Sequence, residues 1–282
     1  MKIAFTKMSG AGNDFIFLGP EYGGLKPMLS GLSRVLCTRR TSVGADGLIL
    51  VEQMGGQAGG QITMHYFNSD GSRASFCGNG ARCLVRYCVE KGIAESPVEF
   101  RSDSGIHVGE IIAEGVRIEV DAPVLLGQLE VGVDDQNYQV YLVDAGVPHA
   151  VILSRDVGSI KVEDVGRRIR NLPAFGREGA NVDFVDTSSG PPFRIRTYER
   201  GVERETLACG SGCIASALVI NFAGLAGASV SLEVASGDTL LVDLGGSPDG
   251  GGHPHKRPLA HLAGPAVITY EGQVEIKETA NV

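Results

Sequence analysis

Apolar residues recur at helical spacing in two stretches that each follow a cysteine and a glycine-bearing turn. In the first stretch they lie at i, i+3, i+4 and i+7, which predicts a helix from about Asn79 to a stop at Gly92. The second, Cys213 to Phe222, is apolar on almost every side, as is typical of a buried helix. Two further helices are predicted at residues 27–39 and 162–171, where apolar residues again share one face.

Many shorter segments have the composition and alternation of β-strands, and turn residues separate them. Strands are expected at residues 3–7, 15–18, 48–52, 62–67, 97–101, 107–112, 116–120, 138–144, 150–153, 181–185, 193–199, 230–234, 239–244 and 267–276. Asp121–Pro123 is the expected domain boundary. It assigns residues 1–122 to a first domain and 123–266 to a second, with 267–282 expected to return to the first.

Two cysteines stand in nearly the same local sequence. Cys77-Gly-Asn-Gly and Cys209-Gly-Ser-Gly each join a strand and a turn to the start of a helix, which indicates a duplicated motif. The first N–H groups of a helix lack intrahelical partners and carry the positive end of its dipole. A thiol placed there is therefore expected to be more acidic than its usual pKa of about 8.5.

The glycines of both motifs add a second expectation. Glycine lets the backbone approach a ligand closely, so that free N–H groups can point at a carboxylate or a phosphate. Two such cysteine-containing sites in one chain imply a single anionic ligand held between two thiols.

Composition narrows the range of partners. The chain has 282 residues, enough for two domains, and a net charge of −8, which argues against nucleic acid or an acidic membrane as partner. No apolar run approaches the 18 residues of a transmembrane helix. The N-terminal segment, interrupted by Lys7, does not have the pattern of a signal peptide. The six cysteines are therefore expected to be reduced thiols in the cytoplasm.

Several further segments accompany the two cysteine motifs. They are Lys7-Met8, Gly12-Asn-Asp-Phe15, Gly44-Ala-Asp-Gly47, Asn68-Ser-Asp-Gly-Ser72, Pro148-His149, Asn181-Val182, Glu199-Arg-Gly201 and Thr206-Leu-Ala-Cys209. In this order, and spread over most of the chain, they resemble the diaminopimelate epimerases, pyridoxal-independent enzymes that interconvert LL- and meso-2,6-diaminopimelate. Each segment is weak evidence alone, and the set is specific.

The resemblance implies an α/β (α+β) fold of two pseudo-symmetric domains. Each would be a curved, barrel-like mixed β-sheet wrapped around a central helix, with the active site in the interdomain cleft. It implies an amino-acid epimerase, an isomerase of lysine and peptidoglycan precursor biosynthesis, whose partner is the small molecule diaminopimelate. No cofactor and no metal are expected. The sequence leaves the oligomeric state open, and a homodimer is one expectation.

The resemblance also implies the site residues. Cys77 and Cys209 are expected as catalytic acid and base, with His149 and Glu199 beside them in the catalytic group. The expected substrate-binding residues are Asn13, Asn68, Gly78, Asn79, Asn181, Glu199, Arg200, Gly210 and Ser211. The guanidinium of Arg200 suits the distal carboxylate of the substrate.

Two thiols also suit the chemistry. The α-proton of an amino acid is a very weak acid, and most racemases use pyridoxal phosphate as an electron sink. No lysine here stands in an obvious pyridoxal-anchoring context. Inversion needs a base on one face of Cα and an acid on the other, which a thiolate and a thiol can supply.

The chain departs from the family pattern at three places. Val147 stands where asparagine often precedes Pro-His, so one side-chain contact to the substrate is expected to be missing or replaced. Gly47 occupies a position that can be glutamine. The segment Glu199–Thr206 is one residue longer than the commoner form.

Other interpretations compete with this one. A buried cysteine is often only a small apolar residue, which is the interpretation for Cys37, Cys83, Cys88 and Cys213. The cysteine spacings do not match the usual C-x2-C of zinc sites. A disulfide between Cys77 and Cys209 would be an oxidised product rather than a structural link.

Two other functions remain as alternatives. Proline and hydroxyproline epimerases share the two-cysteine arrangement but usually have histidine where Asn79 stands. A non-catalytic module that binds a small anion is the non-enzymatic alternative. Gly245–His255 is expected to be an exposed loop, with His261 nearby also in solvent, and the role of residues 245–261 is left open.

Overall fold

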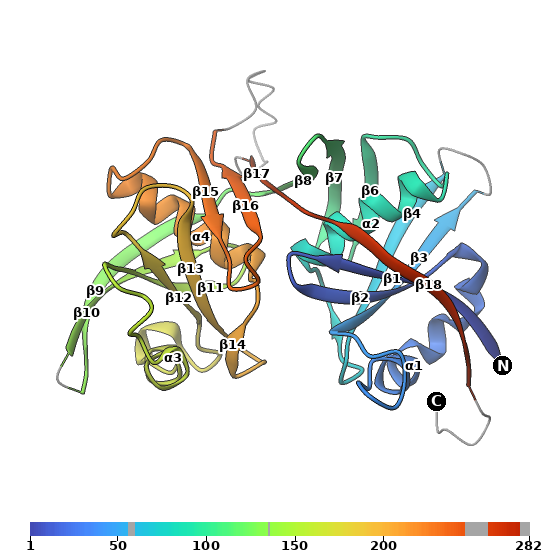
Figure 1. The fold of residues 1–282 in the computed structure, drawn as a ribbon, viewed down its shortest axis with the longest axis horizontal. Helices are drawn as coiled ribbons and strands as arrows, with labels where there is room; N and C mark the ends of the chain where they lie inside the picture. Colours follow the sequence, from blue (N-terminus) through green and yellow to red (C-terminus); the bar gives the residue numbers. More distant parts are fainter. Residues whose placement is uncertain (56–59, 135, 246–258, 277–282) are drawn as a thin grey trace. The chain divides into compact units, whose positions relative to one another are not determined.

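The computed structural model describes residues 1–55, 60–134, 136–245 and 259–276 (Figure 1). It divides into two compact units, Met1–Ile118 together with the chain from Gly264 onward, and Glu119–Ala263. The last strand, β18 (Val267–Glu275), pairs antiparallel with β1 (Lys2–Gly10) in the first unit. Most of the expected loop at residues 245–255 lies outside the described residues.

The other elements follow in chain order. The first unit contains β2 (Asn13–Leu18), the 3-10 helix η1 (Pro20–Met28), α1 (Leu29–Leu36), β3 (Gly47–Met54), β4 (Gln61–Asn68), β5 (Arg73–Ala74), α2 (Gly78–Glu90), β6 (Val98–Ser102), β7 (Gly105–Ile112) and β8 (Gly115–Asp121). The second contains β9 (Val124–Val133), β10 (Gln136–Asp144), β11 (Pro148–Ser154), α3 (Val162–Arg170), the 3-10 helix η2 (Pro173–Phe175), β12 (Asn181–Asp186), β13 (Phe193–Glu199), β14 (Arg204–Thr206), α4 (Gly210–Phe222), β15 (Ser229–Glu233), β16 (Thr239–Asp243) and β17 (Leu259–Gly264).

The two units repeat one topology. In the first, β2 and β3 are parallel strands joined through α1, and β4 and β6 are parallel strands joined through α2. In the second, β11 and β12 are parallel and joined through α3, and β13 and β15 are parallel and joined through α4. The hairpins β1–β2 and β10–β11 correspond, as do the antiparallel pairs β3–β4 and β12–β13. The expected fold class, two mixed α/β halves of similar design, is confirmed.

Each unit has a central helix with strands on several sides (Figure 1). The helix α2 contacts β1, β2, β6, β7 and β18, and α4 contacts β9, β10, β11, β12, β15 and β16. This surrounding sheet explains why α4 is apolar on nearly every side, because no face of it meets water over most of its length. Separate apolar clusters lie under α1 and α3, where Leu29, Leu32 and Ile169 are fully buried.

Both central helices begin and end in the same way. Cys77 and Cys209 are their N-cap residues, with extended backbone at φ −147°, ψ 115° and φ −128°, ψ 110°. Gly92 and Gly224 follow the last turns with positive φ of 64° and 71°. The next N–H group, of Ile93 or Leu225, bonds back over five residues to Cys88 O or Ile220 O, which is the Schellman arrangement.

Several sequence predictions differ from the structure in detail. The helix expected at 27–39 is shorter, since Leu29–Leu36 is α-helical and Pro20–Met28 is a 3-10 helix. The helix expected from Cys213 begins at Gly210, because glycines mask the apolar periodicity of its first turn. No strand was expected at Val124–Val133, which forms β9. His261, expected in solvent, lies in β17 with its Nδ1 buried.

No helix among residues 1–55, 60–134, 136–245 and 259–276 combines the length and hydropathy that a membrane span requires.

The packing of α3 on β13 can be tested at Gly166. A Cβ atom there would lie 2.5 Å from Tyr198 Cβ and 2.7 Å from its Cγ, too close to be relieved by rotating the ring. Alanine normally favours a helix over glycine by about 1 kcal/mol, but overpacking costs about 1–3 kcal/mol. We expect the overpacking cost to exceed the gain in helix propensity, so that Gly166→Ala lowers the free energy of unfolding in urea by up to about 2 kcal/mol. Gly227→Ala, with nothing within 4 Å of the added carbon, is the control. Equal stability of both variants would show that α3 does not pack closely on β13.

Candidate active site

Cys209 caps the central helix of the second unit and is buried. The first helical hydrogen bond runs from the Cys213 N–H to the Cys209 carbonyl at 3.0 Å. The N–H groups of Gly210, Ser211 and Gly212 therefore precede the helical ladder and form its electropositive end. The Ser211 hydroxyl lies 3.5 Å from Cys209 Sγ.

Polar side chains continue from Ser211 into the interior of the second unit. Ser211 Oγ is 2.9 Å from His149 Nε2, and His149 Nδ1 is 2.6 Å from Asp183 Oδ2. The side chains of His149 and Asp183 are both 0% exposed. Thr197 Oγ1 donates to the other carboxylate oxygen of Asp183 at 2.7 Å. A fully buried histidine–aspartate pair therefore lies close to Cys209.

Strand register brings these residues together. His149 of β11 pairs with Asn181 of the parallel strand β12, and Asp183 lies two residues further along β12 on the same face. Asn181 Nδ2 is 3.2 Å from His149 Nε2, and Asn181 Oδ1 accepts the Arg200 backbone N–H at 2.8 Å. Arg200 extends its guanidinium to the exposed Glu178 at 4.0 Å.

The thiol of Cys209 is less acidic than its helix position suggested. Burial raises the pKa of Cys209 well above its ordinary value, and the charges of Glu199 and Asp183 raise it further. Hydrogen bonds from Ser211 and from the Gly212 N–H lower the pKa, but not enough to offset burial. The expectation of an acidic thiol is wrong for Cys209, because the desolvation of the thiolate outweighs the helix N-terminus.

Cys77 occupies the equivalent position in the first unit and is half-buried. The Ala81 N–H bonds to the Cys77 carbonyl at 2.8 Å, which leaves the N–H groups of Gly78, Asn79 and Gly80 ahead of the helical ladder. The same backbone arrangement therefore begins both central helices.

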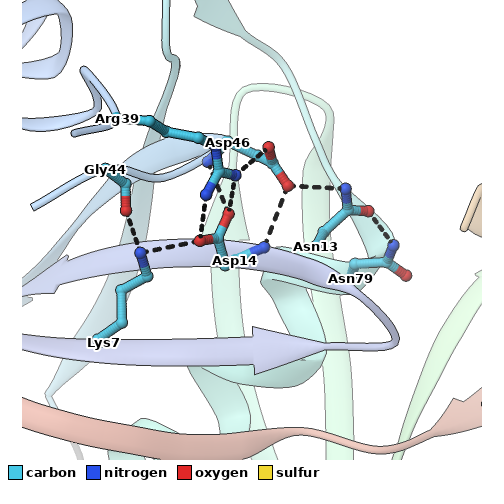
Figure 2. Close-up of polar contacts among 7 residues, drawn as sticks. All are labelled: Lys7, Asn13, Asp14, Arg39, Gly44, Asp46 and Asn79. Carbon is cyan, nitrogen blue, oxygen red and sulfur yellow. Dashed lines mark hydrogen bonds and ion pairs between the residues drawn. The ribbon is translucent and has the colours of Figure 1, made fainter. Parts of the chain in front are cut away.

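A cluster of four charges lies at the β1–β2 hairpin of this unit (Figure 2). Lys7 Nζ is 2.8 Å from Asp14 Oδ2 and also contacts the Gly44 carbonyl. Arg39 donates to both Asp14 and Asp46, at 2.6 Å and 2.8 Å. Each of these carboxylates also accepts the backbone N–H of the other aspartate, at 3.0 Å and 3.2 Å. Burial would raise the pKa of Asp14, but hydrogen bonds from Arg39 and Lys7 and their charges hold it below its usual value.

This cluster fixes the orientation of Asn13. Asn13 Nδ2 donates to Asp46 at 3.1 Å, and Asn13 Oδ1 accepts from Asn79 Nδ2 at 2.5 Å (Figure 2). Asn79 Oδ1 in turn accepts from Arg82 at 2.7 Å, and Arg82 is 0% exposed. The side chain of Asn79 is thus held inside the unit by hydrogen bonds to Asn13 and Arg82.

Asn68 is the last residue of β4, where the turn toward β5 begins. Its Nδ2 donates to Ser72 Oγ at 3.0 Å, and its carbonyl accepts the Ser33 hydroxyl at 2.6 Å. The bond from Ser33, a residue of α1, fixes Asn68 against that helix, and the bond to Ser72 fixes its side chain within the turn.

The remaining cysteines are packing residues. Burial raises the pKa of Cys37 to about 11 and those of Cys83 and Cys88 to about 12. Cys213 is also buried, at 1% exposure. Thiols of this kind are unreactive at neutral pH.

With this geometry established, comparison with known proteins identifies the family. The family model described as diaminopimelate epimerase matches residues 5–126 and 141–243, which include both cysteine motifs. The chain belongs to the diaminopimelate epimerase family. A relative of that name from Aquifex aeolicus (strain VF5) is 37% identical over 250 residues, covering 85% of this chain and 89% of the relative. One from Archaeoglobus fulgidus is 34% identical over 297 residues, covering 99% and 98%.

Solved structures show the same fold. The chain superposes with a TM-score of 0.70 on a probable proline racemase from Agrobacterium radiobacter K84, at 14% identity and over 99% of this chain and 94% of that one. It superposes with a TM-score of 0.73 on a phenazine biosynthesis protein of the PhzF family from Bacillus anthracis, at 13% identity and over 98% and 100%. At this identity the likeness shows the fold alone.

Hydrogen bonds connect some of the family's motif residues within each unit. In the second unit, hydrogen bonds link Cys209, Ser211, His149, Asn181 and the backbone of Arg200. In the first unit, they link Asn13 and Asn79, the residue that follows Gly78. Asn68 bonds within its own turn instead. The roles of these residues in catalysis stay predictions.

Sequence reasoning missed the residues that hold the family's site residues in place. These are Asp14, Arg39, Asp46, Arg82, Asp183 and Thr197. Asp14 and Asp46 lie inside two of the family motifs, Gly12–Phe15 and Gly44–Gly47, and that membership was the signal that could have found them. Asp183 lies between Val182 and Phe184 in β12, a strand that is buried along its whole length, and an acid between apolar residues of such a strand is itself a signal.

Two departures from the family pattern have a structural explanation. A Cβ atom on Gly47 would lie 2.5 Å from the Tyr66 ring, so Tyr66 occupies the space that a glutamine would need. The lengthened loop after Glu199 is held by Glu203, which accepts the Gly201 N–H at 2.9 Å and the Tyr198 hydroxyl at 3.0 Å. Nothing in the structure explains Val147.

The charge cluster of this diaminopimelate epimerase homologue can be tested with Asp14→Asn. Lys7 is 6% exposed and would lose its carboxylate partner, a loss on the order of 3 kcal/mol in the free energy of unfolding at pH 7. The pKa of Asp14 is lower in the folded state than in the unfolded state. The Asp14 carboxylate therefore stabilises the fold fully above the unfolded pKa of about 3.9, and this stabilisation is lost as the pH falls through the folded-state pKa.

Urea unfolding at pH 7 and pH 3 measures this effect. The difference between wild type and Asp14→Asn should shrink at pH 3. Asp134→Asn, which removes an exposed pair with Arg168, should cost less than about 1 kcal/mol at either pH. A difference for Asp14→Asn that stays constant with pH would show that the charge of Asp14 does not stabilise the cluster.

Proposed function

We propose that this protein interconverts LL- and meso-2,6-diaminopimelate, with Cys77 and Cys209 as the acid and base that serve opposite faces of Cα. One observation carries the proposal. In a chain that matches the diaminopimelate epimerase family over both halves, each unit places a cysteine at the N-cap of its central helix, followed by Gly-x-Gly. The relatives of this name from Aquifex aeolicus and Archaeoglobus fulgidus are 37% and 34% identical to the chain.

The helix N-termini suit the α-carboxylate of the substrate. The N–H groups of Gly78 and Asn79 and those of Gly210 and Ser211 precede the first helical bonds. When a proton leaves Cα, negative charge builds up on the carboxylate, and oriented N–H groups stabilise it without reorganisation. Removal of water from around them strengthens that interaction.

The distal end of the substrate carries a second carboxylate and an amine. Arg200 offers a planar fork for the carboxylate, and Asn13, Asn68, Asn181 and Glu199 offer amide and carboxylate groups for the rest. Asn13 and Asn181 are already oriented by bonds to Asp46 and to the Arg200 backbone. Such fixed side chains lose little freedom on binding a ligand.

The proposal needs no pyridoxal phosphate. Lys7, the lysine found among the buried residues of the described chain, is held by Asp14 and the Gly44 carbonyl. A side chain bound inside the unit in this way is poorly placed to form a Schiff base with pyridoxal phosphate.

We place the enzyme in lysine and peptidoglycan precursor biosynthesis, in the cytoplasm, where its thiols stay reduced. A homodimer is part of the proposal. Val267 and Tyr270 leave large apolar side chains exposed on β18, a surface that suits association with a second copy.

An assay on purified protein without added pyridoxal phosphate tests the function. We expect interconversion of LL- and meso-diaminopimelate and no turnover of L-proline or trans-4-hydroxy-L-proline. Cys77→Ala and Cys209→Ala should each lower kcat by at least about 10²–10⁴-fold, the usual contribution of a general acid or base. Cys37→Ala, which removes a buried thiol outside both motifs, is the control and should stay active. Turnover of proline alone would favour the proline epimerase alternative, and binding of diaminopimelate without turnover would favour the anion-binding module.

A further inference from the structure

We infer that Ser211, His149 and Asp183 form a buried proton relay for the thiol of Cys209, in which Asp183 is a positioning residue. The inference rests on the proposed function, since it assigns a route for the proton that Cys209 must lose before it can act as a base. Asp183 is not among the site residues that the family resemblance implies, and Ser211 is among them only as a substrate-binding residue.

The first argument is continuity. Cys209 Sγ to Ser211 Oγ is 3.5 Å, Ser211 Oγ to His149 Nε2 is 2.9 Å, and His149 Nδ1 to Asp183 Oδ2 is 2.6 Å. The first of these is within the range for a hydrogen bond to sulfur, and the other two are ordinary or short. The chain of contacts therefore connects the thiol to a carboxylate through two side chains that can both accept and donate a proton.

The second argument fixes the tautomer of His149. The Arg200 backbone N–H donates to Asn181 Oδ1, so the atom of Asn181 that faces the imidazole is the nitrogen Nδ2, a donor. In the neutral imidazole, Nε2 then carries the lone pair, and Nδ1 carries the proton that it donates to Asp183. Thr197 holds the other carboxylate oxygen of Asp183 at 2.7 Å. Nε2 is thus directed as a proton acceptor toward Ser211.

The third argument concerns charge. A buried carboxylate close to a thiol opposes ionisation of that thiol, and Asp183 and Glu199 both do so for Cys209. Asp183 can favour thiolate formation only through the imidazolium that it faces. The first turn of α4 packs directly against the Asp183 carboxylate, since a Cβ atom on Gly212 would be 2.4 Å from Asp183 Oδ1. Gly212 is therefore required for Asp183 to reach this position.

The relay balances as follows. The S–H bond of Cys209 breaks and its proton forms a new O–H bond on Ser211, while the original hydroxyl proton of Ser211 passes to His149 Nε2. The products are a thiolate and an imidazolium, and Asp183 stabilises the imidazolium as a buried ion pair. The reverse transfer restores the thiol. Glu199, the other carboxylate near Cys209, retains its proposed place in the substrate site.

Alkylation of Cys209 distinguishes the relay from a simple nearby charge, because the two predict opposite changes. The thiolate is the reacting form, so the rate with iodoacetamide reports ionisation. If Asp183 acts through His149, Asp183→Asn should slow alkylation of Cys209 about tenfold at pH 7.5, equivalent to a rise of about one pKa unit. If Asp183 acts only as a negative charge near the thiol, removing that charge favours the thiolate, and alkylation of Cys209 should be faster in the same variant. Mass spectrometry of the labelled peptides measures the extent of alkylation at Cys209, and the alkylation of Cys77 in the same sample is the internal standard.

Further variants complete the test on the full-length protein. Ser211→Ala should slow alkylation as Asp183→Asn does, and Ser211→Thr, which keeps the hydroxyl, should restore most of the rate. Glu52→Gln is the matched control, because Glu52 and His65 form a similar carboxylate–histidine pair at 2.8 Å in the first unit. It should leave the rate at Cys209 unchanged. Faster or unchanged alkylation of Cys209 in Asp183→Asn overturns the relay.

Nitrogen NMR of wild-type protein labelled with 15N-histidine gives an independent result even where a variant fails to fold. The relay requires His149 to carry its proton on Nδ1 when neutral, and a signal showing the proton on Nε2 would overturn it. Neither measurement needs diaminopimelate. A protein that fails the epimerase assay but passes these tests would contradict the proposed function and not the relay.

Discussion

The N–H groups at the start of α2 and α4 come before the first helical hydrogen bonds, from Ala81 to Cys77 and from Cys213 to Cys209. Strands surround each helix, so these groups and the capping thiol are positioned by packing rather than by a flexible loop. Each cysteine can occupy its N-cap because its backbone is extended and the next residue is glycine. Most other features of each unit follow from the need to pack a buried helix that begins in this way.

In both units polar side chains surround the start of the central helix, but the side chains differ between the units. The second residue after the cysteine is Asn79 in one and Ser211 in the other, and each contacts a polar residue near the start of the corresponding strand, Asn13 of β2 or His149 of β11. Behind Asn79 lies the buried cation Arg82, and behind His149 lies the carboxylate of Asp183. The duplicated backbone thus carries an amide network in one unit and a titratable one in the other.

The sequence predicted the elements that depend on local pattern. The two central helices were visible from their apolar periodicity and their glycine stops, and the two thiols from repetition of Cys-Gly-x-Gly. What it missed depends on contacts between residues far apart in the chain. Asp183 meets His149 only because β11 and β12 are parallel and in register, and burial of Cys209 reverses the effect that its helix N-terminus would have on the thiol. Local sequence contains neither the register nor the depth of burial.

The central claim is that two thiols, one from each unit, serve opposite faces of the same carbon. Epimerisation in D2O tests it most directly, because a thiol exchanges its proton with solvent before returning it. Starting from either epimer, the product should carry deuterium at Cα from its first formation, while recovered substrate stays largely unlabelled. Product that retains the original hydrogen at Cα would mean that one base works on both faces, and would contradict the account.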